Sequence, residues 1–188
     1  MTWEELENAC LSCKGCALAE NRRNVVIGKG SKTAPILFVG EGPGENEDIQ
    51  GVPFVGAAGQ LLDQALISIG YKPEDYYIGN VVKCRPPQNR VPFDAECNAC
   101  IGYLRAQFAL IRPKIVVCLG SVASNYLIER DIKITKARGV WREKKGVWFM
   151  PTYHPAALLR DESKKLDMWK DIKAAYDKLQ ELKTTGLV

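Results

Sequence analysis

Short apolar runs alternate along this chain with stretches in which apolar residues recur at helical spacing. The runs are typical of buried strands and occur at Ile36–Val39, Tyr76–Val82, Ile115–Leu119 and Val147–Thr152. Helices are predicted from Thr2, from Ala58 to Gly70, from Asp94 to Pro113, from Val122 to Leu127 and towards the C-terminus. Strands that alternate with helices in this way indicate an α/β fold with a mostly parallel sheet.

Three finer expectations concern less regular stretches. Asn24–Gly28 is expected to be a strand or an extended segment. The stretch from Arg138 to Lys145 is expected to form a hairpin or a pair of edge strands. The C-terminal helix is expected to bury one apolar stripe, made of Leu166, Trp169, Ile172, Tyr176, Leu179 and Leu182.

Length and composition suit one globular domain over residues 1–188. The chain has 188 residues and is 46% apolar, which is enough to build a sizeable core. Its longest apolar runs are far shorter than the roughly 20 residues of a membrane span, so we expect no membrane association. The first residues, Met1–Glu5, are acidic and do not resemble a leader peptide. We therefore expect a cytoplasmic protein.

The net charge of +4 is too small to indicate nucleic-acid binding by itself. Its distribution is more informative, because six basic residues cluster in one stretch: Lys133, Lys136, Arg138, Arg142, Lys144 and Lys145. Such a cluster could contact phosphates, or it could be the solvated face of a hairpin. Both interpretations stay open at this point.

Seven cysteines are many for a cytoplasmic chain of this size, where stable disulfides are disfavoured. Metal or cluster binding is the leading explanation. Cys118 lies within an apolar strand and is expected to be a core residue. The other six are Cys10, Cys13 and Cys16, which are spaced by two residues, then Cys84, Cys97 and Cys100. Six candidates are available for what we expect to be a four-ligand site.

A glycine-rich turn, Gly40–Asp48, follows the first apolar strand. In an open parallel sheet, the carboxyl ends of the strands are where ligands bind. The glycines allow backbone amides to approach a ligand, whereas the acidic residues argue against a phosphate cradle.

Two further polar residues stand out. Asn80 is a polar amide within another apolar strand and must find a hydrogen-bond partner. His154 is the only histidine in the chain. We expect Asn80 and His154 to emerge at the same sheet edge as Glu41.

Taken together, these stretches resemble the family-4 uracil-DNA glycosylases, the iron–sulfur branch of that superfamily found in bacteria and archaea. The matching motifs are Gly40-Glu41-Gly42-Pro43-Gly44-x-x-Glu47-Asp48, Gly51-x-Pro53-Phe54-Val55-Gly56, Asn80-Val81-Val82-Lys83-Cys84-Arg85-Pro86-Pro87-x-Asn89-Arg90 and His154-Pro155-Ala156-x-Leu158-Leu159-Arg160. They occur in the family's order and cover nearly the whole chain.

The resemblance implies a three-layer α/β/α fold around a mostly parallel four-stranded sheet. It implies a monofunctional enzyme of base excision repair that flips uracil out of DNA, hydrolyses its N-glycosidic bond and leaves an abasic site. The expected partner is uracil-containing DNA, single- or double-stranded, bound by a monomer.

The resemblance also implies roles for individual residues. Glu41 and His154 are the expected catalytic residues, since Glu41 can orient the attacking water and His154 can donate to uracil O2. The expected uracil pocket consists of Glu41, Gly42, Pro43, Glu47, Phe54, Asn80 and His154. Within it, Phe54 offers a stacking face, Asn80 matches the O4 and N3–H edge of uracil, and Glu47 crowds the position of the thymine methyl group.

Contacts to DNA are expected from a second group of residues. Leu158 and Leu159 resemble the family's wedge, which fills the gap left by the flipped nucleotide. Arg85, Arg90 and Arg160 could bind phosphates, with surface salt bridges as the alternative for each.

The family pattern further selects Cys13, Cys16, Cys84 and Cys100 as ligands of a [4Fe-4S] cluster. We interpret the role of this cluster as structural, and a redox or charge-transport role stays open. Cys10 and Cys97 each lie three residues before a proposed ligand, so ligand exchange stays open.

Two other functions fit parts of the sequence. One is an iron–sulfur redox protein, although the distance between Cys16 and Cys84 is unlike the compact spacing of ferredoxins. The other is a DNA-binding module on the same fold without catalysis, which the presence of Glu41, Asn80 and His154 disfavours. A branch of the superfamily that attaches covalently to DNA through a histidine in an inserted basic loop is also disfavoured, because the chain has no second histidine.

Overall fold

The structure is a computed structural model that describes all 188 residues. In chain order its elements are α1 (Trp3–Leu11), α2 (Leu18–Asn21), β1 (Lys29–Gly30), β2 (Ile36–Gly40), α3 (Glu45–Gln50), α4 (Ala57–Ile69), η1 (Pro73–Asp75), β3 (Tyr76–Asn80), η2 (Pro87–Asn89), α5 (Asp94–Ile111), β4 (Ile115–Leu119), α6 (Ser121–Leu127), α7 (Ile134–Ala137), β5 (Arg142–Lys144), β6 (Val147–Thr152), α8 (Pro155–Arg160), η3 (Glu162–Lys164) and α9 (Lys165–Thr184). No helix is long and apolar enough to cross a membrane.

One six-stranded sheet with the order β1-β3-β2-β4-β6-β5 forms the centre of the fold. The four inner strands β3, β2, β4 and β6 are parallel, as expected. The sheet is wider than the four strands expected, because β1 and β5 add short antiparallel strands at its two edges. β5 and β6 form the hairpin that was predicted for the basic stretch.

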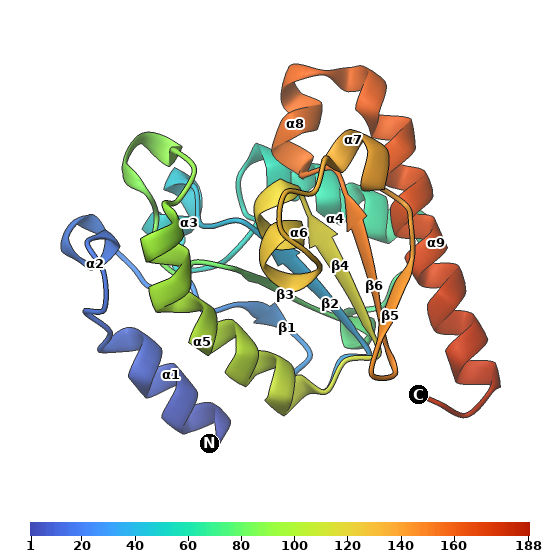
Figure 1. Cartoon of the computed structure of the whole chain (residues 1–188), viewed down its shortest axis with the longest axis horizontal. Helices are drawn as coiled ribbons and strands as arrows, with labels where there is room; N and C mark the ends of the chain where they lie inside the picture. The colour runs from blue at the N-terminus through green and yellow to red at the C-terminus, as the bar shows by residue number, and fades with distance from the viewer.

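Helices cover both faces of the sheet, which confirms the three-layer arrangement (Figure 1). Along β2, Leu37 and Val39 pack into one core cluster, with residues of α5 and α6. Ile36 and Phe38 point to the opposite face and pack into a second cluster, with residues of α4, α8 and α9. This strand is buried on both faces, which is why its sequence is continuously apolar instead of alternating.

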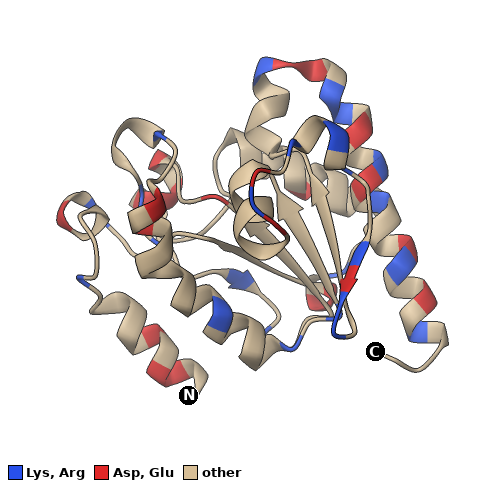
Figure 2. Ribbon diagram, viewed as in Figure 1, with Lys and Arg blue, Asp and Glu red and all other residues tan.

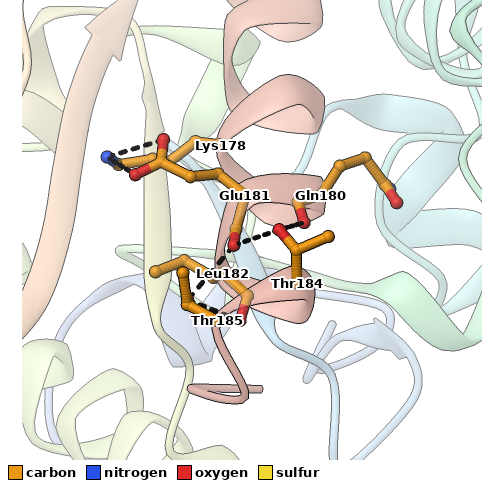
Figure 3. A network of polar contacts seen from close by, with 6 residues as sticks. All are labelled: Lys178, Gln180, Glu181, Leu182, Thr184 and Thr185. Atoms are coloured by element: carbon orange, nitrogen blue, oxygen red, sulfur yellow. Dashed lines mark hydrogen bonds and ion pairs between the residues drawn. The ribbon is translucent and has the colours of Figure 1, made fainter.

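The helix ends follow the local sequence signals. Thr2 and Glu5 form the predicted capping box at the start of α1. Gly70 ends α4 in the left-handed conformation, with φ of 101°. At the end of α9, the Thr184 and Thr185 hydroxyls donate to backbone carbonyls of the last turns (Figure 3). These bonds satisfy acceptors that a helix terminus otherwise leaves to water.

Of the two alternatives for Asn24–Gly28, the strand is excluded. The segment forms no ladder and is held by isolated hydrogen bonds, such as the one from the Val26 amide to the Lys83 carbonyl (2.8 Å), and the edge strand begins only at Lys29. Two positions of the apolar stripe expected for the C-terminal helix were wrong. Within α9, Leu166 is 60% exposed and Trp169 is 37% exposed. Met168 is buried in their place, because the face of α9 towards the sheet continues from Met168 through Ile172.

The order of the strands places a ligand-binding crevice between the inner strands. From β2 the chain passes through α4 to β3 on one side, and from β3 through α5 to β4 on the other side of β2. The two crossover helices lie on opposite faces of the sheet. At such a switch point the loops separate at the carboxyl ends of the strands and leave space for a ligand.

A buried ion pair fixes the end of β6, two residues before His154. Arg138 donates to both carboxylate oxygens of Asp171, at 3.0 and 2.6 Å. The Thr152 hydroxyl also donates to Asp171, at 2.6 Å, and Asp171 is only 3% exposed. This network joins α9 to the segment after α7 and to the last residue of β6.

We expect Asp171→Ala to lower the free energy of unfolding by about 3 kcal/mol, because the Arg138 guanidinium and the Thr152 hydroxyl both lose their buried acceptor. Arg138 then keeps only the carbonyl and the partly exposed carboxylate of Asp167. Denaturant unfolding of the purified variant measures this change. Asp177→Ala is the matched control, since its pair with Lys173 is exposed and should contribute less than about 1 kcal/mol. Equal effects of the two variants would contradict the assignment.

Candidate active site

The crevice at the carboxyl ends of the strands is a cleft of about 630 Å³. It is lined by residues that follow β2, β3, β4 and β6. All of the residues that the sequence proposed for a pocket line it: Glu41, Gly42, Pro43, Glu47, Phe54, Asn80 and His154. Positions that are more than a hundred residues apart in the chain thus meet at one edge of the sheet.

Asn80 is the last residue of β3 and is 1% exposed. Its Oδ1 is the only buried side-chain nitrogen or oxygen atom in the chain without a hydrogen-bond partner. Gly40 makes this position possible, because a Cβ there would collide with Oδ1 and lie 2.7 Å from the Phe54 ring. An unpaired buried acceptor is costly, so Asn80 is ready to accept from a donor placed in the cleft.

His154 is the N-cap of α8, and its Nδ1 accepts from the Ala156 amide at 3.1 Å. The proton of the neutral ring therefore lies on Nε2. Burial, together with the nearby Arg160 charge, lowers the pKa of His154 to about 4. His154 is thus a neutral imidazole with one N–H donor at neutral pH.

Glu41 continues from β2, where the Val82 amide donates to its backbone carbonyl at 3.1 Å. This bond extends the parallel ladder past the end of β3 and fixes the backbone at Glu41. The carboxylate forms no ion pair, and burial raises its pKa. A partly desolvated carboxylate of this kind can accept a hydrogen bond or a proton from water.

Glu47 holds the loop that presents Phe54. Its Oε1 accepts from the backbone amides of Val55 at 2.9 Å and Gly56 at 2.8 Å. Phe54 itself has a φ of 54°, a conformation that side chains other than glycine adopt rarely. Its ring lies 5.8 Å from the His154 ring, with 30° between the planes. Glu47 thereby stabilises the strained loop in which Phe54 is held over the cleft.

The two rims of the cleft carry the residues proposed for DNA contact. Leu159 is 53% exposed and lies with Arg160 on one rim. The neighbouring Leu158 is 2% exposed and packs in the core beneath α8, so its side chain is not available as a wedge. On this short helix, only one of the two leucines can face away from the protein.

Arg90 on the opposite rim, and Arg85 just before that rim in the chain, are already paired. Arg90 donates to both carboxylate oxygens of Glu96, at 2.8 and 2.7 Å. Arg85 donates to Asn89 Oδ1 at 2.8 Å and lies 3.5 Å from a carboxylate oxygen of Glu45. The structure thus places both in the intramolecular contacts that were the alternative to phosphate binding.

The basic stretch divides into two parts. Residues of α7 lie near the cleft, which Ile134 lines, whereas those of the β5–β6 hairpin lie towards the other end of the strands (Figure 2). In the hairpin, Arg142 pairs with Glu129 at 2.5 Å, and Lys144 donates to the Ile128 carbonyl. These contacts favour the interpretation of the hairpin as a solvated face.

Comparison with known proteins agrees with this arrangement. Residues 27–180 match the family model of the uracil DNA glycosylase superfamily. The type-4 uracil-DNA glycosylase of Sulfurisphaera tokodaii is 45% identical over 191 residues, covering 97% of this chain and 85% of that protein. Those of Thermotoga maritima and Archaeoglobus fulgidus are 48% and 44% identical, covering 82% and 83% of this chain and 81% and 82% of theirs.

The chain belongs to the type-4 uracil-DNA glycosylase family. The resemblance inferred from the motifs is therefore confirmed, as is the three-layer α/β/α arrangement that it implied, although the sheet has six strands instead of four.

A second site in this glycosylase lies where α1, α2, the loop after β3 and α5 meet. Cys13, Cys16, Cys84 and Cys100 all line one small cavity there. Three of the sulfurs accept hydrogen bonds: Cys13 from the Gly15 amide (3.4 Å), Cys84 from Arg22 Nη1 (3.2 Å) and Cys100 from the Lys83 amide (3.3 Å). No three potential ligands in the chain are grouped to hold a single metal ion. A four-iron cluster instead takes one thiolate at each iron, which suits separate cysteines around a common space.

The remaining cysteines differ in their surroundings. Cys10 is 1% exposed and lines the same cavity. Cys97 does not line it and lies against Tyr126. Cys118 is fully buried in β4, as predicted for a core residue.

Sequence reasoning missed Arg22 and the role of Lys83 beside the cavity. Arg22 reaches Cys84 across 62 positions of the chain, and no local pattern indicates such a contact. Lys83 stands in a recognised motif, but nothing in the motif indicates that its side chain is buried.

Proposed function

We propose that this protein is a monofunctional uracil-DNA glycosylase that hydrolyses the bond between uracil N1 and deoxyribose C1′. The observation that carries the proposal is the unpaired, buried Oδ1 of Asn80 at the edge of a cleft that also holds a neutral histidine. Uracil supplies the donor that this oxygen lacks, through its N3–H. The expected biological role is removal of uracil from DNA in base excision repair.

Base recognition follows from the amide of Asn80. Oδ1 accepts from N3–H while Nδ2 donates to O4, so one side chain matches two adjacent groups of uracil. Cytosine presents an unprotonated N3 and an amino group at these positions and reverses both contacts. Phe54 stacks against the flipped base, and the loop held by Glu47 limits the space beside C5.

Cleavage leaves the electron pair of the N1–C1′ bond on uracil, so that negative charge develops at O2. His154 Nε2–H donates to O2 and stabilises this charge. Glu41 orients a water molecule, whose oxygen bonds to C1′ while Glu41 accepts its proton. The carboxylate also favours the positive charge that develops on the sugar. The products are the uracil anion, which is protonated by solvent, and an abasic site.

Contacts with DNA come from the rims of the cleft. Leu159 fills the space of the flipped nucleotide, and Arg160, which forms no ion pair in the free protein, binds a neighbouring phosphate. Arg85 and Arg90 shape the opposite rim through their own pairs. We place the protein in the cytoplasm as a monomer that acts on single- or double-stranded DNA.

We further propose that Cys13, Cys16, Cys84 and Cys100 hold a [4Fe-4S] cluster. Their common cavity and the hydrogen bonds that their sulfurs accept support this ligand set. When bound, the cluster supplies a covalent crosslink and no step of the hydrolysis. It ties the N-terminal segment to the Cys84 loop, whose next residues form a rim of the cleft. Cys97 does not line the cavity, which argues against it as a substitute for Cys100.

The test is release of free uracil from a uracil-containing oligonucleotide without added cofactor or divalent metal, alongside thymine and cytosine strands. The Asn80→Asp variant is expected to lose about 10- to 100-fold in kcat/KM for uracil and to gain measurable cytosine release, because a protonated carboxyl can donate to cytosine N3. Asn125→Asp is the matched control, since Asn125 lies outside the cleft and keeps its acceptor oxygen for the Ile132 amide.

No uracil release by cluster-loaded wild-type protein would overturn the enzyme proposal and favour a DNA-binding or redox protein on this fold. Release that is unchanged in Asn80→Asp would remove Asn80 from base recognition.

A further inference from the structure

Lys83 is a fully buried lysine that the hydrolysis proposed above does not use. It follows the end of β3 by three residues and is 1% exposed. An ammonium group removed from water is costly unless anions or several acceptors surround it. No carboxylate pairs with Lys83, so its charge must be balanced in another way.

The side chain of Lys83 points back to the residue proposed to recognise uracil. Its Nζ donates to the Asn80 carbonyl at 2.8 Å and to Gln107 Oε1 at 2.6 Å. Gln107 is itself fixed, because its Nε2 donates to the Ile27 carbonyl at 2.9 Å and to the Tyr77 hydroxyl at 3.3 Å. The ammonium thus clamps the backbone of Asn80 to α5 at the point where the strand ends.

The same residue borders the cysteine cavity. The Lys83 backbone amide donates to Cys100 Sγ at 3.3 Å, and Lys83 is among the residues that line the cavity. The ionisable groups that act on its ammonium are the thiols of Cys100 and Cys10. Lys83 therefore contacts a proposed cluster ligand through its backbone amide and the Asn80 carbonyl through its ammonium group.

We propose that Lys83 is a positioning residue that couples the cluster to the uracil pocket. Its charge balances the negative charge of the thiolate-ligated cluster, and its hydrogen bond to the Asn80 carbonyl keeps the Asn80 amide directed at the base. The proposal rests on the cluster and on the role of Asn80 stated under the proposed function. It gives the cluster an electrostatic effect on base recognition in addition to its crosslinking role.

The test compares Lys83→Met with the wild type, both loaded with the cluster. Two quantities are measured: the midpoint potential of the cluster, and the inhibition constant of free uracil, which reports base recognition without the chemical step. Removing a positive charge beside the cluster disfavours its more negative, reduced form, so the midpoint potential is expected to fall. The inhibition constant is expected to rise about tenfold, because the Asn80 carbonyl loses its charged donor.

Lys178→Met is the matched control. The Lys178 side chain is 17% exposed, packs over Trp148 and lies on α9, away from both sites. It is expected to change neither quantity. Lys83→Gln, which is neutral but keeps a donor, is expected to lower the potential as Lys83→Met does, with a smaller rise in the inhibition constant. It also replaces Lys83→Met if the latter does not fold.

An unchanged midpoint potential, together with an inhibition constant within twofold of the wild type, in the Lys83 variants would overturn the proposal. A change in only one of the two quantities would overturn the coupling, because the same ammonium is proposed to act on both. Uracil release by the wild type is measured separately, so failure of this proposal is distinguishable from failure of the proposed function.

Discussion

Replacing His154 by alanine is expected to lower kcat for uracil release by about 10²- to 10³-fold. The variant removes the donor that lies where negative charge develops on O2, and this interaction is stronger in the transition state than with the bound base. KM is expected to change much less, because Asn80 and Phe54 still hold the base. Single-turnover kinetics with a uracil-containing oligonucleotide measures the chemical step directly.

His154→Gln is the matched variant, since a glutamine amide can donate from a similar distance. It is expected to restore part of the rate lost in His154→Ala. If the two variants were equally slow and both bound DNA poorly, His154 would act in folding or binding and not as a donor to O2.

The pH dependence of the wild type distinguishes a neutral from a charged His154. Its pKa is lowered to about 4, so the ring is neutral and keeps its Nε2 proton throughout the range above that value. If the imidazolium were the active form, the rate would fall as the pH rose through the pKa. We expect no such fall near pH 6.5; instead the rate rises with pH as Glu41, whose pKa is raised by burial, loses its proton.

Much of the fold could be predicted because the inner strands are buried on both faces. Ile36–Val39 and Ile115–Leu119 are continuously apolar for this reason, and both were assigned correctly. The edge strand Lys29–Gly30 could not be found in the same way. It is two residues long and half exposed, and only its pairing with Ile78 and Tyr77 makes it a strand.

The site was predictable where one residue type is unusual in its surroundings. Asn80 in an apolar strand and Glu41 in a glycine-rich turn are such cases, and both line the cleft. Leu158 and Leu159 carry no such signal, because the same residue type stands at both positions. Only the packing of α8 on the core decides that Leu158 is buried and Leu159 is exposed.

Long-range polar partners were the least predictable part. Arg138 lies in a basic stretch, and its pairing with Asp171 depends on how α9 crosses the end of β6. Which of Cys10 and Cys97 reaches the cysteine cavity also depends on how distant elements pack together. Both are spaced by three residues from a proposed ligand, yet only Cys10 reaches the cavity, where the end of α1 meets α5.

Cys84→Ser is expected to abolish binding of the [4Fe-4S] cluster and to lower the free energy of unfolding by about 3 kcal/mol or more, because the binding energy of a structural metal group is also folding energy. Cys84 is the ligand closest in sequence to the cleft rim formed by Pro86, Asn89 and Arg90. The variant also replaces the sulfur that accepts from Arg22, so this loop is then held to the preceding segment by contacts such as the bond from the Val26 amide to the Lys83 carbonyl. Iron and sulfide content and thermal unfolding under anaerobic conditions measure both effects.

Cys97→Ser is the matched control, because Cys97 is equally buried but lies off the cavity. It is expected to keep a full cluster with only a modest loss of stability. A cluster retained in Cys84→Ser but lost in Cys97→Ser would mean that α5 presents Cys97 and not Cys100 to the iron. Since one turn of helix separates these residues, that result would also require α5 to rotate and so release the Lys83 amide from Cys100. The control therefore tests the ligand set and the orientation of the helix that holds it.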